Sequence, residues 1–549
     1  MLDRDETDSL FPSDLPEPAH WEQQYPLRDL PAGAQVTRFC PSPTGFAHIG
    51  GIYVAMLDKA VADQSGGVFL IRIEDTDQAR EVVGATAQFD RVFGYFGVGS
   101  EETDTTGRYG PYTQSHRFQI YLTYVREFLR VGKAYLCFAT REELAAAAAE
   151  QREAKVPTGY YGRWATWRDA PDGLVRERLT AGQPYVMRFR SPGEPAGRVS
   201  YTDVIRGPIE TDDNRNDVVI LKSSANALRL PTYHFAHMVD DHLMRVTAVV
   251  RGDEWISSVP VHLQLFDAAG FDRIPYAHIA PLMKQDGSTK RKLSKRKDPE
   301  ANVEYYISGG YPADGVLYYL RGLANSRLAE LPVQQALREP LRLEECGVAG
   351  PLVDLVKLED ISADLIALMK SGDILHQVLG WAAAHDPELE RAVAAEEDLA
   401  LRALTIEREG AENPRKDLRK WSDFRPVYGY FFRALFEPMS DPADPRLGGL
   451  DPAVVRWLCA DLLRDYRDLT DGDAWFAQIR DASQANGFAA SVKEYKKDPA
   501  AYPGSIREAS QVVRVLLTGS TRSPALHLVA NVLGEQEVRR RVGAVLLPS

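Results

Sequence analysis

The sequence predicts an α/β domain in the first half of the chain and an all-α region in the second half. Three observations predict this fold class. Strand-like and helix-like runs alternate from Gln35 onwards, which is typical of a parallel sheet. The first strand leads through a glycine-containing loop into a helix, and such a turn presents backbone N–H groups to an anion. After Leu293, apolar residues recur at helical spacing almost to the end of the chain.

Size, charge and cysteine content bound the class of protein. With 549 residues, the chain is long enough for roughly three to five domains. It has no run of about 18 apolar residues and begins with acidic residues, so we expect neither a membrane span nor a signal peptide. The four cysteines form no CxxC pair, which favours a reducing, cytoplasmic location. A net charge of -13 argues against bulk nucleic-acid binding, but a local basic surface remains compatible with it.

The first part of the chain divides into an extension and the beginning of the sheet. Residues 1–34 are rich in Pro, Asp and Glu and show no sustained period, so we expect an extension that is ordered in part at best. Its role cannot be inferred from its residues. Strands and helices then alternate as strand Val36–Cys40, helix Ile52–Asp63, strand Val68–Ile73, helix Ala85–Phe96 and helix Ser115–Val131. Ligands collect at the carboxyl ends of such parallel strands.

Residues 134–226 differ from their surroundings in composition and pattern, and they predict an inserted α+β domain. They contain an alanine run and turn-rich, aromatic and Arg-rich segments, with strand-like pieces at Tyr185–Phe189 and Val218–Leu221. The α/β pattern resumes with a strand at Val246–Val250 and a helix at Ile256–Ala269. The insertion would therefore split the α/β domain into residues 35–133 and 227–270.

The second half predicts helical modules. Apolar residues share helix faces in three sets: Leu365, Leu368 and Met369; Val454, Leu458 and Leu462; Val512, Val513 and Leu516. Prolines and glycines between residues 442 and 449 mark a boundary between two modules. We therefore predict a connecting domain at 271–370 and two helical modules at 371–440 and 441–549.

Two stretches near strand ends carry residues suited to ligand binding. Residues 38–51 form the first strand, a loop stiffened by two prolines, and a helix start at which His48 would add a donor beside a bound anion. Taken alone, this is also compatible with an ordinary strand–helix turn. Arg72, Glu74 and Asp77 leave the end of the next strand, where a solvated helix cap is an equally good interpretation.

A third stretch, Lys290–Lys297, holds six basic residues in eight. Such a loop suits a polyphosphate whose charge grows on a leaving group, because lysine acts as a mobile point charge. Ser294 could hydrogen-bond a phosphate oxygen. Taken alone, the loop would more often be solvated or part of a nucleic-acid patch. Together with residues 38–51, it favours a phosphate-handling site.

These stretches resemble the signature motifs of a known enzyme family. Residues 38–45 with 48–51, and residues 292–296, resemble the two signature motifs of class I aminoacyl-tRNA synthetases. Further motifs resemble bacterial glutamyl-tRNA synthetases in particular: Arg72–Asp77, Pro231–Ala236, Arg251–Trp255 and, in the helical half, Lys416–Trp421. Residues 41–45 read Pro-Ser-Pro-Thr-Gly, which is typical of the glutamate enzymes, whereas glutaminyl relatives usually carry Pro-Glu-Pro-Asn-Gly. The resemblance extends from about Gln35 through the helical half.

The resemblance implies a fold for each predicted region. It implies a Rossmann-type catalytic domain, an inserted domain that binds the acceptor end of tRNA, and a connecting, stem-contacting domain that carries the basic loop. The two helical modules would bind the anticodon. Some family members bind zinc in the insertion through several cysteines, but only Cys137 stands there in this chain, so we expect no zinc.

Glutamate offers one ammonium and two carboxylates, so its site needs an anion and fork-shaped cations. Glu74 is the candidate for the ammonium. The resemblance assigns the carboxylates to Arg38 and Arg251, with Tyr233 as a hydroxyl donor. Two arginines favour a diacid over a neutral amide. The remaining candidates on the glutamate side are Cys40, which stands where alanine is usual, His237, which replaces a smaller or amide residue, and Ser42.

The resemblance also implies the ATP site and the reaction. ATP, with Mg²⁺, would be held by His48, Gly50, Glu254, Met283, Lys292, Leu293, Ser294, Lys295 and Arg296. The glutamate carboxylate would attack the α-phosphorus, and the acyl group would then pass to the terminal adenosine of tRNA. His48, Lys292 and Lys295 would stabilise the transition state, so catalysis is positioning plus charge stabilisation. No dedicated protein cage for Mg²⁺ is evident.

The sequence therefore predicts a monomeric ligase that joins L-glutamate to tRNA-Glu and needs tRNA even for the first step. Two alternatives remain. One is a ligase that charges glutamine or also charges tRNA-Gln. The other is a non-catalytic, synthetase-like tRNA-binding protein, against which the intact His48, Lys292 and Lys295 argue. A truncated tRNA-modifying relative is excluded by the long helical half.

Overall fold

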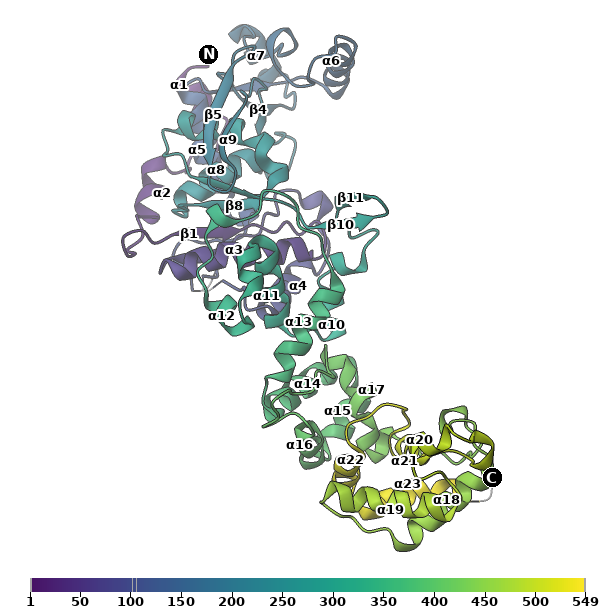
Figure 1. Cartoon of the computed structure of the whole chain (residues 1–549). Coiled ribbons are helices and arrows are strands. Elements are labelled where there is room, and N and C mark those ends of the chain that lie inside the picture. The colour runs from purple at the N-terminus through teal and green to yellow at the C-terminus, as the bar shows by residue number, and fades with distance from the viewer. Residues whose placement is uncertain (1, 101, 105, 548–549) are drawn as a thin grey trace. The chain divides into compact units, whose positions relative to one another are not determined.

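The computed structural model describes residues 2–100, 102–104 and 106–547, and the chain forms two compact units (Figure 1). The first unit comprises Met1–Tyr305 and Leu317–Val353, and the second comprises Tyr306–Val316 and Asp354–Ser549. Within the described residues, all strands belong to the first unit, and the second unit consists of helices and loops. The predicted class, α/β followed by an all-α half, is confirmed.

The predicted parallel sheet begins with a βαβ unit. Strand β1 (Val36–Phe39) pairs in parallel with β2 (Val68–Ile71), so that Arg38 lies opposite Leu70. Helix α3 (Ile49–Gln64) connects the two strands. The backbone N–H of Thr247 donates to the carbonyl of Val36 over 2.9 Å, which places the chain leading into the next sheet beside β1.

A four-stranded sheet of order β6-β5-β9-β8 continues the domain. Strands β8 (Val249–Gly252), β9 (Tyr276–Ile279) and β5 (Arg198–Asp203) run parallel, while β6 (Gly207–Asp212) forms an antiparallel hairpin with β5. The sequence analysis predicted neither β9 nor the β5–β6 hairpin. Because β5 lies within residues 134–226, the predicted insertion contributes strands directly to this central sheet.

The rest of that insertion contains an antiparallel sheet of β3 (Ala134–Cys137), β4 (Val186–Phe189) and β7 (Val219–Leu221). The two strand-like pieces predicted in this region are therefore confirmed to within one residue. Helices α6 (Arg141–Glu153) and α7 (Asp172–Thr180) belong to the same segment.

Three helices of the α/β domain follow the predicted apolar periods: α4 (Ala85–Tyr95), α5 (Phe118–Arg130) and α9 (Val259–Ala269). Helix α8 (Tyr233–Leu243) was not predicted. Helix α3 begins at Ile49 rather than at the predicted Ile52. The reason is local: the His48 side chain accepts a hydrogen bond from the N–H of Gly50, and this cap extends the helix through two glycines of low helix propensity.

The N-terminal extension is ordered, which corrects the expectation for residues 1–34. It forms α1 (Arg4–Asp8) and α2 (Pro18–Gln24), which pack beside α5 (Figure 1). Trp21 and Tyr25 are buried in the core of the first unit, and the indole N–H of Trp21 donates to Thr123 Oγ1 over 3.0 Å. One aromatic residue on α2 and one directly after it provide this packing, and two such residues produce no period that the sequence reveals.

The helices after the central sheet begin with α10 (Glu304–Gly309), α11 (Ala313–Ala324) and α12 (Val333–Arg338). The second unit continues with α13 (Leu355–Ala367), α14 (Ser371–His385), α15 (Pro387–Ala394), α16 (Glu397–Thr405), α17 (Phe424–Tyr428), α18 (Pro452–Asp465), α19 (Gly472–Ala485), α20 (Val492–Tyr495), α21 (Ile506–Thr518), α22 (Leu526–Leu533) and α23 (Glu535–Gly543). None of the described helices is long and apolar enough to cross a membrane.

The predicted helix faces of the second unit are confirmed in two of three cases. Leu458 and Leu462 of α18 are buried, with Val454 packed beside them, and all three residues predicted on α21 are buried. On α13, Leu365 is buried, but Leu368 is 76% exposed. The helix ends at Ala367, so Leu368 leaves the helical direction and the predicted face stops before it.

Candidate active site

A cavity of about 450 Å³ lies in the first unit, at the carboxyl ends of the parallel strands β1, β8 and β9. This is the edge at which ligands collect in α/β sheets. Eleven of the residues predicted for the site line it: Arg38, Cys40, His48, Gly50, Glu74, Tyr233, Arg251, Glu254, Lys292, Leu293 and Lys295. The fold therefore brings together residues that lie as much as 257 positions apart in the chain.

Five predicted residues do not line this cavity. Ser42 lines a neighbouring hollow, together with Lys295. Met283 starts strand β10, where its N–H donates to Pro351, and the N–H of Ser294 donates to the Asp298 carboxylate. The remaining two are His237, which is fully buried, and Arg296, which is exposed.

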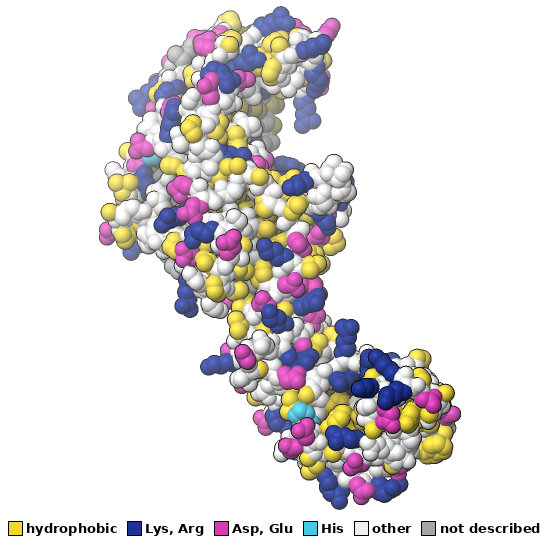
Figure 2. Space-filling model, in the orientation of Figure 1, with side chains coloured by type: hydrophobic (Ala, Val, Ile, Leu, Met, Phe, Trp, Pro, Cys, Tyr) yellow, Lys and Arg dark blue, Asp and Glu magenta, His cyan; other side chains and the backbone are white. Residues whose placement is uncertain are grey.

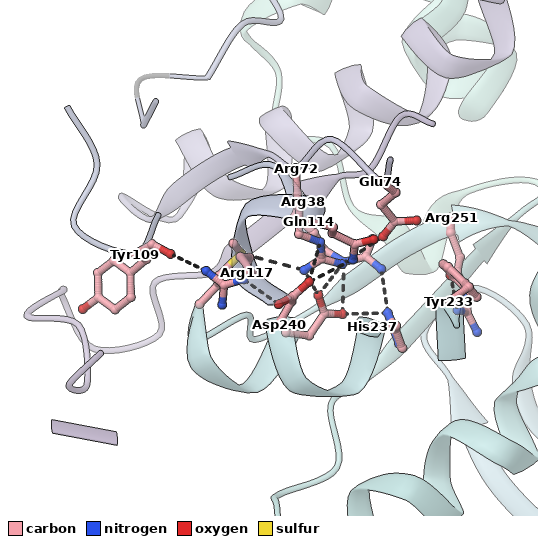
Figure 3. Close-up of polar contacts among 12 residues, drawn as sticks. Arg38, Arg72, Glu74, Tyr109, Gln114, Arg117, Tyr233, His237, Asp240 and Arg251 are labelled. Atoms are coloured by element: carbon pink, nitrogen blue, oxygen red, sulfur yellow. Dashed lines mark hydrogen bonds and ion pairs between the residues drawn. The ribbon is translucent and has the colours of Figure 1, made fainter. Parts of the chain in front are cut away.

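Arg38 is held by a buried ion network behind the cavity (Figure 3). Its Nε lies 3.2 Å from Asp241 Oδ2, and Arg72 binds the other oxygen of Asp241 over 2.6 Å. Arg72 also donates to Glu74 over 3.2 Å. Buried charges are tolerated only when they are paired in this way. The network therefore fixes the direction in which Arg38 presents its guanidinium group.

The second carboxylate of this network belongs to the neighbouring residue of α8, Asp240. Arg117 donates to it over 2.7 Å and Gln114 over 2.9 Å (Figure 3). Tyr121 also donates to it, over 2.8 Å. All of these side chains are buried. Consecutive aspartates of one helix thus serve two sides: Asp241 orients the arginine of the cavity, and Asp240 anchors the helix to the protein behind it.

His237 contacts Arg38 instead of the cavity. Its Nδ1 lies 3.0 Å from Asp241 Oδ2 and 3.4 Å from the guanidinium of Arg38, and its Nε2 lies 3.1 Å from the hydroxyl of Tyr276. Burial and the nearby arginines lower the pKa of His237 well below its ordinary value, so the ring is neutral. It is a supporting residue of the Arg38 network.

Glu74 and Arg251 present opposite charges to the same cavity. Burial raises the pKa of the Glu74 carboxyl, although Arg72 and Arg38 act against that shift. The guanidinium of Arg251 lies 3.5 Å from the Tyr233 hydroxyl and 4.6 Å from the ring centre of Tyr276. An anion, two guanidinium groups and a hydroxyl therefore surround one space.

His48 combines a structural and a chemical property. Its Nδ1 accepts the N–H of Gly50 over 2.8 Å, which caps helix α3. Burial, together with the charges of Lys295 and Lys292, lowers the pKa of His48 to about 4. The ring is therefore neutral at pH 7. Because Nδ1 is the acceptor, the proton sits on Nε2, where it can be donated to a ligand.

The basic segment is partly a hairpin, whereas the sequence predicted a flexible loop. Strands β10 (Met283–Asp286) and β11 (Thr289–Lys292) are antiparallel. Arg291 binds Asp298 through two bonds of 2.6 and 2.7 Å, so this cation holds the hairpin in place. Lys292 and Lys295 of the segment line the cavity instead.

Of the two lysines predicted for catalysis, Lys292 contacts Glu254, and Lys295 contacts the first motif. Lys292 Nζ lies 3.2 Å from Glu254 Oε1, and both side chains are about half exposed. Lys295 Nζ donates to the carbonyl of Phe46, in the loop that precedes His48. Lys295 thereby joins the segment that follows the β10–β11 hairpin to the β1–α3 turn.

The cavity also has walls that the sequence analysis did not assign. Trp255 lines it and lies 4.5 Å from Tyr233 between ring centres. Residues 279–282, which follow the unpredicted strand β9, form another wall. Flanking prolines at positions 275 and 281 shorten that apolar run, but its β-branched and aromatic content was a usable signal. Among the described side chains, no group of three or more His, Cys, Asp or Glu could hold a metal ion.

Comparison with known proteins identifies this arrangement. The family model for tRNA synthetases class I (E and Q), catalytic domain, matches residues 35–343. That match defines the class of protein to which the sheet and the cavity correspond.

Relatives along the full length define the family. The glutamate–tRNA ligase of Clostridium perfringens (strain 13 / Type A) is 41% identical over 544 residues, which cover 97% of this chain and 98% of the relative. The glutamate–tRNA ligase of Acetivibrio thermocellus is 38% identical over 548 residues, covering 98% and 99%. A crystal structure of a glutamate tRNA ligase from Elizabethkingia meningosepticum CCUG26117, in complex with its amino acid, superposes with a TM-score of 0.75 at 25% identity, covering 93% of this chain and 99% of the other. The chain belongs to the glutamate–tRNA ligase family of class I tRNA synthetases.

Proposed function

We propose that this chain attaches L-glutamate to tRNA-Glu with consumption of ATP, through a glutamyl-adenylate. One observation carries the proposal. A single cavity joins groups suited to a dicarboxylic amino acid, Glu74, Arg38 and Arg251, to groups suited to a triphosphate, His48 and the basic hairpin. Both reactants of the first step would meet there, and their proximity is what an in-line displacement requires.

At the amino-acid end, Glu74 accepts the substrate ammonium, and Arg38 and Arg251 bind the carboxylates. Tyr233 adds a hydroxyl donor, and Cys40 leaves room as a small apolar neighbour. Glutamine would leave a guanidinium without an anion in a site of low dielectric constant. Sites built for a charge or a hydrogen bond reject such analogues by roughly 10⁴-fold.

At the nucleotide end, His48 donates its Nε2 proton to a phosphate oxygen, and Lys292 and Lys295 offset the charge that grows on the leaving pyrophosphate. ATP enters as its Mg²⁺ complex, as a substrate. Gly50, Glu254 and Leu293 line the space for the nucleoside. Met283, Ser294 and Arg296, which lie outside the cavity, would reach ATP only through a shift of the β10–β11 hairpin and the segment after it.

The reaction consists of two displacements. An oxygen of the glutamate α-carboxylate attacks the α-phosphorus, a new O–P bond forms, and pyrophosphate leaves. A ribose hydroxyl of the terminal adenosine of tRNA then attacks the acyl carbon, and AMP leaves. No covalent bond to the protein is needed, so catalysis consists of positioning and charge stabilisation.

The remaining regions would bind tRNA. Residues 134–226 would grip the acceptor end, residues 271–370 the stem, and the helical modules the anticodon. On the face shown in Figure 2, basic and acidic side chains are interspersed, so tRNA contacts would be local rather than spread over one positive field. We propose a cytoplasmic monomer, which size-exclusion chromatography with light scattering would test.

Aminoacylation with labelled glutamate or glutamine, and with tRNA-Glu or tRNA-Gln, tests the proposal. We expect charging of tRNA-Glu with glutamate. Charging with glutamine alone would overturn the assignment of the substrate, and charging of neither tRNA would favour a non-catalytic tRNA-binding protein. Glutamate transfer to tRNA-Gln as well would make the enzyme non-discriminating. ATP–pyrophosphate exchange with and without tRNA tests whether the first step depends on tRNA.

A further inference from the structure

Arg251 is held from behind by a histidine that does not line the cavity. Strands β8 and β9 are parallel, and their register places Arg251 directly beside His278. The guanidinium Nε donates to His278 Nε2 over 3.0 Å. This is shorter than the contacts of Arg251 with Tyr233 (3.5 Å), His262 (3.4 Å) and the Trp255 carbonyl (3.3 Å). His278 therefore makes the shortest of these contacts with the guanidinium.

His278 is in turn held by Asp203, the last residue of β5. The His278 Nδ1 lies 2.6 Å from Asp203 Oδ2. The same carboxylate accepts the backbone N–H groups of Ile205 (3.0 Å), Arg206 (2.9 Å) and His278 itself (3.2 Å). With so many donors directed at it, this carboxylate has a fixed position in the sheet.

The positions of the protons follow from the donors. A guanidinium group only donates, so His278 Nε2 must accept and the ring proton must be on Nδ1, facing Asp203. His278 is fully buried and Asp203 is 1% exposed. Burial and the charge of Arg251 lower the pKa of His278, which agrees with a neutral ring. The arrangement Asp203–His278–Arg251 is thus a chain of directed bonds that ends at the cavity.

A purely structural role explains this chain poorly. A buried carboxylate and a buried guanidinium are costly to desolvate, and a well-packed apolar pair stabilises a sheet at least as well. By contrast, hydrogen-bond partners behind a functional side chain commonly fix its tautomer and its direction. Of the three residues Asp203, His278 and Arg251, only Arg251 lines the cavity.

We propose that His278 and Asp203 are positioning residues for Arg251 and so for glutamate binding. The inference rests on the proposed function, because it takes from it the role of Arg251 as a carboxylate ligand. It adds that β5, a strand contributed by residues 134–226, takes part in setting the geometry of the glutamate site. The two positioning residues should affect the binding of glutamate and not of ATP. Among the bonds of the described residues, neither Asp203 nor His278 contacts His48 or the basic hairpin.

Kinetics of His278→Leu and His278→Gln test the proposal. The leucine removes both bonds, whereas the amide of glutamine can accept from Arg251 and donate to Asp203. We expect His278→Leu to raise the KM for glutamate about 10- to 100-fold, by analogy with the loss of a hydrogen-bond partner behind a metal-ligating side chain. The KM for ATP should stay within twofold, and His278→Gln should recover most of the loss. His20→Leu, at an exposed site of α2, is the matched control.

Three outcomes separate this inference from the proposed function. If Arg251→Ala leaves the KM for glutamate unchanged, the proposed role of Arg251 is wrong. If Arg251→Ala raises it but the His278 variants are equal to each other, only the positioning role is wrong. If the KM of the double variant rises by the product of the two single factors, His278 and Arg251 act independently, which also contradicts the positioning role.

Should His278→Leu fail to fold, Asp203→Asn decides in its place. It keeps an oxygen that can accept the Nδ1 proton but removes the charge. We expect a several-fold rise in the KM for glutamate at unchanged KM for ATP, and an equal change of both constants would overturn the proposal.

Discussion

Single side chains in this protein carry two roles at once, and His48 is the clearest case. Its Nδ1 caps helix α3, and its Nε2 carries the proton that it is proposed to donate to a phosphate oxygen. The two roles can be separated, because the serine hydroxyl also caps helices, but serine has no group that corresponds to Nε2 of His48.

We expect both His48→Ser and His48→Ala to slow adenylate formation by about 10²-fold, the usual loss for one transition-state donor. Only His48→Ala should also lower the free energy of unfolding, by about 1 kcal/mol, the typical value of an N-cap. Pyrophosphate exchange measures the first effect and urea denaturation the second. Equal activity of wild type and His48→Ser would show that the Nε2 proton is not used.

The lysines of the basic segment 290–297 offer a second test at this scale. Lys295 lines the cavity, whereas the neighbouring Lys297 is exposed and does not line it. Lys295→Ala should reduce adenylate formation by about 10²- to 10³-fold, because a cation beside the leaving pyrophosphate is lost. Lys297→Ala serves as the control for the net charge. Filter binding of tRNA should be similar for both variants, and a selective loss of tRNA binding in Lys295→Ala would instead indicate a nucleic-acid contact.

At the scale of elements, the N-terminal helices are tied to the catalytic domain by ion pairs. Glu22 of α2 accepts bonds from His242 (2.8 Å), Arg245 (2.9 Å) and Tyr124 (2.9 Å). Arg130 of α5 binds Asp8 over 2.7 Å in the same region. Partial burial by itself would raise the pKa of Glu22, but the bonds from His242 and Arg245 lower it to about 2.

This shift predicts a pH dependence of stability. A carboxyl whose pKa is lower in the folded state stabilises the fold above its unfolded pKa of about 4.5, and the contribution is lost as the pH falls towards 2. Glu22→Gln should therefore be less stable than wild type at pH 6, with a smaller difference at pH 3.5. Urea denaturation at both values measures it. Glu177→Gln, at an exposed site of α7, is the control for removing one carboxylate, and a pH-independent difference for Glu22→Gln would contradict the assignment.

Strand β5 shows why the sequence does not reveal to which sheet a strand belongs. Its residues alternate in burial and lie in a segment of different composition, so the sequence analysis grouped them with the insertion. The pairing of β5 with β9 depends on a contact between residues 203 and 276. Long-range strand register is set by packing across the sheet, and local periodicity contains no information on it.

At the scale of the whole molecule, the two units have separate hydrophobic cores. The core of the first unit includes residues of α2, α5, α8 and α9, and the second unit holds two cores formed by its own helices. All residues of the candidate active site lie in the first unit. Glutamate and ATP should therefore stabilise one unit and leave the other unchanged.

Scanning calorimetry tests this expectation. We predict two unfolding transitions, of which only one moves to higher temperature with glutamate and ATP. At a ligand concentration of 100 times Kd, the added stability is about 2.7 kcal/mol. Glycerol-matched buffer and an unrelated amino acid are the controls. A single transition, or an equal shift of both, would show that the units unfold as one cooperative body.

Local chemistry was determined by the sequence alone. The turn at residues 38–51, the basic stretch at 290–297 and the helical periods of the second half could be assigned because each depends on neighbours within a few positions. The eleven predicted site residues that line the cavity were assigned from such local motifs and from the family resemblance, and the fold brings them together. The family motifs also predicted the glutamate–tRNA ligase relationship that the relatives bear out.

The tertiary structure decided what depends on distant partners. It converted His237 from a candidate ligand into a support of Arg38, used Arg291 to hold the hairpin, and ordered an extension that the sequence left without structure. It also placed Asp203 behind Arg251 through His278. The physical reason is common to all four: burial and pairing between residues far apart in the chain set the direction and charge of a side chain, and no local pattern encodes them.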